Sequence, residues 1–146
     1  MDHVAILNKS WKLIPKIISG EKAIESRWYL NKTAPWNKVK EGDVIYFKDA
    51  GMSVEAKAEV AQIVQYEKYD AVTLNKIIDD YYGKGGICFV ASKEEVLDWA
   101  SGKKYCILIF LKNPQKVEPF EINKLGFGNA CAWLCVNDIN KVKMPR

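Results

Sequence analysis

The sequence predicts a single α+β domain over residues 1–146, built on a mostly antiparallel, partly closed β-barrel with helices at its ends. Segments of strand type outnumber helical segments, whereas a doubly wound parallel sheet needs a helix for each crossover. No linker, internal repeat or low-complexity tract divides the 146 residues, a length that fits one domain. Hydrophobic residues make up 49% and charged residues 27% of the chain, which is typical of globular proteins.

The first half of the chain is predicted to hold most of the strands. An apolar run over residues 4–7 indicates a buried strand, and Ser10 is expected to cap a helix that ends at Ser19, before Gly20. Pro15 indicates that the regular part of this helix begins late, because proline is tolerated mainly in the first turn. Further strands are expected over residues 22–29, 44–48 and 54–66, with a bulge or two-sided burial near Ala61.

The second half is predicted to hold two helices followed by two strands. Apolar residues from Leu74 to Tyr82 recur at helical spacing, and Ser92 begins a capping-box pattern that opens a helix to about Ala100. The runs over residues 105–111 and 130–136 are almost wholly apolar, which indicates strands buried on both faces.

Composition and charge narrow the range of partners. The 22 Lys and Arg against 18 Asp and Glu give a net charge of +4, which permits an anionic partner but is weaker than a duplex DNA binder usually carries. The four cysteines form no Cys-x-x-Cys pair and His3 is the only histidine, so we expect no metal, no other cofactor, and free thiols. The N-terminal segment has only four successive apolar residues, which is too few for the core of a signal peptide. No apolar run in the sequence approaches the ~20 residues that span a membrane. We therefore expect a cytoplasmic protein with no membrane partner, and the sequence leaves its oligomeric state open.

The segment from Gly20 to Trp28, GEKAIESRW, carries the clearest chemical pattern. On a strand, Glu25 and Arg27 share one face roughly 7 Å apart, and Lys22 in the preceding turn can fold toward the same carboxylate. Arginine offers paired donors to a phosphate or base edge, and glutamate accepts from an exocyclic amino group. The same spacing also fits a structural ion pair at a barrel rim, and spacing alone leaves both interpretations open.

The pattern G-x-K-x-x-E-x-R, here Gly20, Lys22, Glu25 and Arg27, resembles the signature of the ASCH domain family. The following segments EGDVIYFK (41–48) and VEAKAEVAQIVQY (54–66) are similar to the next two strands of that family, and the resemblance covers roughly residues 4–68. It implies a PUA-like β-barrel with a cleft lined by the charged motif residues, which binds RNA or nucleoside derivatives.

Some small proteins of that family resemble amidohydrolases that remove an acyl group from N4-acetylcytidine. They use a lysine and a threonine of the motif, with a glutamate from a later segment. The resemblance places Lys22 at the lysine, but Glu25 stands where those enzymes have the threonine. Ser26 is predicted to point to the opposite face of the strand.

The tryptophans near the motif have two interpretations. Aromatic side chains beside cationic residues suit unstacked bases, and the same side chains can plug a barrel end. For Trp28 both interpretations stay open, and for Trp11 and Trp36 we favour plugging, although Trp11 and Trp28 remain candidates for ligand contact. Trp133 is expected in the core.

Three functions follow from these observations. The leading prediction is a cofactor-free binding module for RNA or a modified nucleoside or nucleotide, with Lys22, Glu25, Arg27, Trp28 and Trp11 as its binding residues. The first alternative is a small amidohydrolase on N4-acylated cytidine-type nucleosides, with Glu25 as general base and Lys22 as oxyanion stabiliser. The second alternative is a non-catalytic protein-interaction adaptor.

Overall fold

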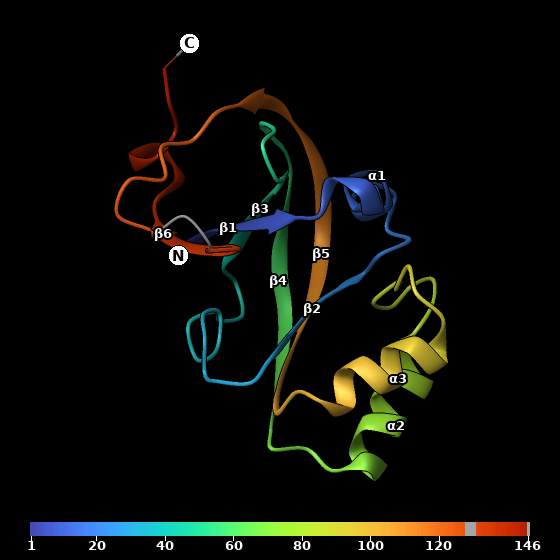
Figure 1. Ribbon diagram of the computed structural model, residues 1–146. Helices are drawn as coiled ribbons and strands as arrows, with labels where there is room; N and C mark the ends of the chain where they lie inside the picture. The colour runs from blue at the N-terminus through green and yellow to red at the C-terminus, as the bar shows by residue number, and fades with distance from the viewer. Residues whose placement is uncertain (128–130, 146) are drawn as a thin grey trace.

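The computed structural model describes residues 1–127 and 131–145, within which six strands form one curled sheet (Figure 1). The strand order is β2-β5-β4-β3-β1-β6. β1 and β3 pair in parallel, and the other pairs are antiparallel. The mostly antiparallel α+β architecture is therefore confirmed. The strands are β1 (Asp2–Leu7), β2 (Ile24–Tyr29), β3 (Val44–Asp49), β4 (Val54–Glu67), β5 (Tyr105–Phe120) and β6 (Trp133–Asn137).

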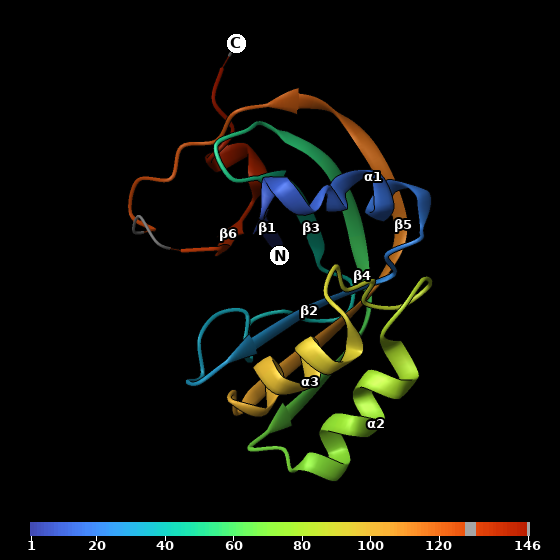
Figure 2. The same cartoon turned by 45° about the vertical axis from the view of Figure 1, so that its right-hand side comes forward.

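The α-helices of the described residues are α1 (Leu13–Ser19), α2 (Ala71–Tyr81) and α3 (Lys93–Ser101), and they pack against the sheet. Figure 2 shows the long strands β4 and β5 curving through the molecule, with α1 near their upper part and the α2–α3 pair beside their lower part. Strand β5 is buried on both faces where it passes between these layers. Its Ile107 and Ile109 pack into the barrel interior with Phe47, while Cys106 and Leu108 pack into a second core under α2 and α3.

Several element boundaries differ from the sequence prediction. A short 3-10 turn (Lys9–Trp11) precedes α1, and Asn8, not Ser10, caps it by accepting from the amide of Ser10. Helix α1 itself begins at Leu13, which places Pro15 in its first turn, as predicted. The capping box at Ser92 is confirmed, since its side chain accepts from the amide of Glu95.

The late strands also differ in length. Strand β5 runs nine residues beyond the predicted end at Leu111, because the ladder to β4 continues although its side chains become mostly exposed. A register shift in that ladder between Val60 and Gln62 confirms the bulge expected near Ala61. Strand β6 begins at Trp133, and Ala130, the predicted start, lies outside the described residues. No described helix is long and apolar enough to cross a membrane.

Candidate functional site

A cavity of about 310 Å³ lies between strand β2, the turn before α1, and the segment from Ile87 to Trp99 that leads into α3. Trp11 and Leu13 form one side, and Phe89, Val96 and Trp99 form another. Charged side chains also reach its lining from two directions, from the start of β2 and from the first turn of α3. Its volume is in the range of ~300–1,000 Å³ that ligand pockets occupy.

Lys22 lies at this cavity as a buried cation with two hydrogen bonds to the backbone. Gly20 ends α1 in the left-handed conformation (φ 84°), which turns the chain so that Lys22 bridges to Gly86. Its Nζ donates to the carbonyl oxygens of Ile24 at 2.9 Å and Ile87 at 2.7 Å. Burial lowers the pKa of Lys22, and the nearby carboxylate of Glu25 opposes that shift. Lys22 therefore joins β2 to the segment before α3 and positions its neighbour Glu25.

Glu25 is the buried anion of the site, with only 4% of its surface exposed. Its Oε1 lies 3.9 Å from Lys22 Nζ and 3.9 Å from Arg27 Nε. Its Oε2 is buried and has no hydrogen-bond partner. Because an unsatisfied buried acceptor costs about 1–3 kcal/mol, this oxygen is the group in the site with most to gain from a donor.

Arg27 contacts Glu25, as predicted, but it does not line the cavity. Its guanidinium donates, at 3.4 Å each, to the carbonyl oxygens of Ala132 and Ile6, and its Cζ lies 5.3 Å from the centroid of the Trp133 ring. Arg27 thus connects β2, at one end of the sheet, to β1 and the residues before β6 at the other. The expectation that all three charged motif residues share one cleft is wrong for Arg27, which lies at the seam of the half-barrel.

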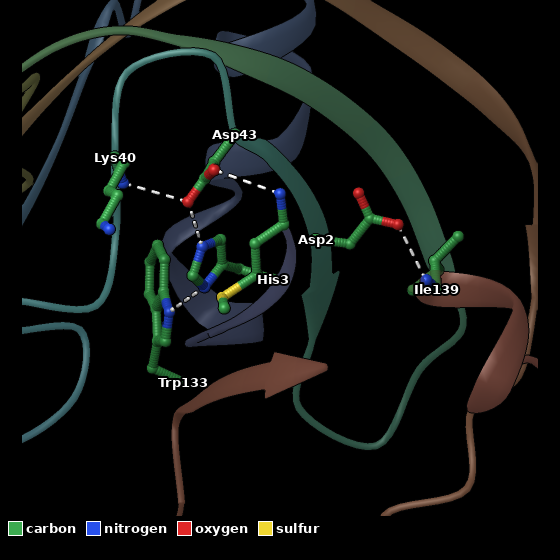
Figure 3. Close-up of polar contacts among 7 residues, drawn as sticks. Asp2, His3, Lys40, Asp43, Trp133 and Ile139 are labelled. Atoms are coloured by element: carbon green, nitrogen blue, oxygen red, sulfur yellow. Dashed lines mark hydrogen bonds and ion pairs between the residues drawn. The ribbon is translucent and has the colours of Figure 1, made fainter. Parts of the chain in front are cut away.

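A buried polar network lies behind this seam (Figure 3). Trp133 Nε1 donates to His3 Nδ1 at 3.1 Å, and His3 Nε2 lies 2.8 Å from Asp43 Oδ2, which also accepts from the amide of Lys40 at 3.0 Å. Because an indole N–H can only donate, Nδ1 is the acceptor and Nε2 carries the proton of a neutral imidazole. Burial lowers the pKa of His3, with the hydrogen bond to Asp43 opposing it. The network fixes the orientation of the Trp133 ring, which the Arg27 guanidinium contacts.

The tryptophans near the motif differ in their burial. Trp28 is 6% exposed and donates from Nε1 to Ser26 Oγ at 3.0 Å, so it belongs to the second core and lines the cavity as well. Trp36 is buried against Tyr105 in the barrel core, so it is not available to a ligand. The expectation of plugging is wrong for Trp11, because the turn ahead of α1 leaves it 48% exposed at the cavity.

Sequence reasoning missed the contribution of α3 and the residues before it. Trp99 is 48% exposed and lies edge-on to Trp28, with 6.1 Å between ring centroids. Glu95 lines the same cavity. The two are four residues apart and so share one face of a helix, a signal that was present in the sequence. What the sequence lacked was any sign that this face meets β2.

The lining residues carry an excess of negative charge. Lys22 is the one cation among the described residues that line the cavity, against the two carboxylates of Glu25 and Glu95. No cluster of three or more His, Cys, Asp or Glu side chains able to hold a metal ion occurs within residues 1–127 and 131–145. The cavity therefore offers aromatic surface, one unpaired carboxylate oxygen and a lining with one more negative than positive side chain.

Comparison with known proteins identifies the fold. No protein-family model matches the chain, and no curated protein matches it. Among solved structures, the ASCH protein from Zymomonas mobilis is similar with a TM-score of 0.57 and 20% identity, covering 81% of this chain and 71% of that one. A tyrosine-to-phenylalanine mutant of the Zymomonas mobilis protein gives a TM-score of 0.62 at 19% identity, covering 90% and 87%. A serine-to-alanine mutant of it gives 0.61 at 20% identity, covering 90% and 85%. The chain has the fold of these ASCH proteins, as the resemblance implied.

Proposed function

We propose that this ASCH-fold chain binds RNA or a modified nucleoside or nucleotide, with one unstacked base held in the cavity over Glu25. The observation that carries the proposal is the unpartnered, buried Oε2 of Glu25 in a cavity walled by tryptophan. A carboxylate oxygen accepts from the exocyclic amino group of a base, and aromatic rings stack on its faces.

The charges around the cavity determine which part of a nucleotide enters it. The base enters, and the phosphate stays outside. Two of the three Nζ donors of Lys22 are used by backbone carbonyls, and Arg27 lies at the seam, so neither is free to take a phosphate inside the cavity. Two carboxylates in the lining repel a phosphate further. The phosphate of a nucleotide therefore stays outside, near exposed Lys9 and Lys12, which flank Trp11 in the sequence. The sequence predicted that Lys22 and Arg27 bind the ligand. In this proposal they instead position Glu25, which binds it.

Trp11 and Trp99 are suited to contact the base. Both lie at the cavity with about half of their surface exposed, where a flat ring can cover them without disturbing the core. Stacking on an aromatic side chain is worth ~1–3 kcal/mol per base. Since 1.4 kcal/mol is a factor of ten, removing one ring should weaken binding by about 5- to 150-fold.

Isothermal titration calorimetry with a library of nucleosides, nucleotides and short single-stranded RNAs tests the proposal. We expect a hit whose affinity falls in Trp99→Leu and Trp11→Leu. The matched control is Val72→Ala, an 80% exposed apolar residue on α2 that does not line this cavity, which should bind as the wild type does. If no nucleoside, nucleotide or RNA binds, or if all three variants bind alike, the cavity is not a base-binding site.

A further inference from the structure

The cavity carries features of a cation site that base binding alone does not require. Glu25 and Glu95 contribute two negative charges to its lining, and Lys22 contributes one positive charge. That positive charge is held by the carbonyl oxygens of Ile24 and Ile87, whose partial negative charges face it at 2.9 and 2.7 Å. Lys22 therefore balances one of the two carboxylates, and the charges of the lining sum to one net negative charge.

The aromatic wall acts in the same direction. Trp11, Trp28, Phe89 and Trp99 line the cavity, and tryptophan has the ring that attracts cations most strongly. Aromatic rings, a partnerless buried carboxylate oxygen and a net negative lining together favour a flat ligand that is itself positively charged.

We infer that the cavity selects a nucleobase whose positive charge is spread onto its exocyclic amino group, as methylation of a ring nitrogen produces. This inference rests on the proposed function and names its ligand class. The amino group of such a base makes a charge-assisted hydrogen bond to Glu25 Oε2, which is roughly twice as strong as a bond between neutral groups. The charged ring interacts with the tryptophans at the same time.

Pairs of isomers separate charge from size and shape. 1-Methyladenosine is a cation at neutral pH, and N6-methyladenosine is its neutral isomer. 3-Methylcytidine and 5-methylcytidine form a second such pair. Calorimetric titration of all four into the wild type should show each cation binding at least ~10-fold tighter than its isomer, the size expected of a desolvated cation–aromatic contact with a carboxylate beside it.

Variants locate the source of the preference. In Glu25→Gln the ratio between isomers should fall to within ~3-fold, since a neutral amide loses the charge-assisted bond. Reading the ratio within each variant removes any general loss of stability from the comparison. Glu95→Gln should reduce the ratio in part. Glu94→Gln, the exposed neighbour on α3 that does not line the cavity, should leave the ratio unchanged.

The outcomes distinguish this inference from the function on which it rests. Equal binding of both isomers, or tighter binding of the neutral one, overturns the charge preference and leaves base binding intact. Absence of binding by any nucleoside or RNA overturns both. Equally tight binding of a trimethyl-lysine peptide overturns the assignment to a nucleobase. A single-stranded RNA with one 1-methyladenosine that binds tighter than the nucleoside, with salt-sensitive affinity, supports the inference and identifies RNA as the source of the base.

Discussion

Replacement of Lys22 by methionine tests whether this residue holds the site together. Its Nζ donates to the carbonyl oxygen of Ile24, two residues away, and to that of Ile87, 65 residues away, and it lies 3.9 Å from Glu25 Oε1. Removing one partner of a buried ion pair costs about 3–5 kcal/mol when the other charge is left without compensation. In Lys22→Met, Arg27 remains 3.9 Å from Glu25 and offsets part of that cost. We expect Lys22→Met to lower the free energy of unfolding by about 3 kcal/mol, the lower end of that range.

A second substitution isolates the share that comes from Glu25. In the double variant Lys22→Met/Glu25→Leu the carbonyls of Ile24 and Ile87 still lack their donor, but the buried carboxylate that lost one of its two cations is gone. The double variant should therefore be more stable than Lys22→Met alone by ~1–3 kcal/mol, within the range found when buried pairs are replaced by apolar groups.

Urea unfolding followed by circular dichroism measures both effects. The control is Lys84→Met. The Lys84 side chain is 84% exposed and its Nζ lies 3.4 Å from Glu21 Oε1, so this change should alter stability by less than ~1 kcal/mol. If Lys22→Met is unfolded in buffer, the double variant should recover folding. A loss below ~1 kcal/mol in Lys22→Met, or a double variant no more stable than the single one, would refute the positioning role.

Three further predictions concern acid stability, binding to RNA and catalysis. Burial lowers the folded-state pKa of His3 below its unfolded value of ~6.5, so the folded state resists protonation and stability should fall as pH drops below ~6.5. The melting temperature against pH should show this fall in the wild type and less of it in His3→Gln, which cannot take up the proton. The affinity for RNA should fall as the salt concentration rises. Arg27→Ala removes a contact that positions Glu25, so it should weaken RNA binding more than Lys143→Ala on the C-terminal tail. Equal effects of the two variants would indicate attraction by diffuse charge instead of a site. We expect no acetate release from N4-acetylcytidine, because Glu25 replaces the motif threonine; release that disappears in Glu25→Gln would support the hydrolase alternative.

The parts of the site that depend on local sequence were predictable. The stop at Gly20 and the period of two along β2 placed Glu25 and Arg27 on one face, where they lie in contact. The capping box at Ser92 set the start of α3 to within one residue. These features need only a few neighbouring residues, so the sequence carries them directly.

The parts that depend on distant contacts were not predictable. Lys22 donates to the carbonyl oxygen of Ile87, 65 residues away. Every residue has a backbone carbonyl, so the type of residue 87 gives no indication of this contact. The cavity is completed by Trp99 from the region that resembled no known pattern. Arg27 lies outside the cavity because the sheet curls until β2 comes close to β1, where Arg27 donates to the carbonyl oxygen of Ile6. This curl depends on the pairing of all six strands and not on the motif.

The account depends most on the claim that Glu25 accepts a hydrogen bond from the exocyclic amino group of a base. Cytidine and uridine differ at that position by an amino group against a carbonyl oxygen, and glutamine, unlike glutamate, can also donate. We predict that the wild type binds cytidine at least ~10-fold tighter than uridine, which is about 1.4 kcal/mol, and that Glu25→Gln abolishes or inverts this preference. Equal affinity for the two nucleosides in the wild type, or a cytidine preference that persists unchanged in Glu25→Gln, would contradict the account.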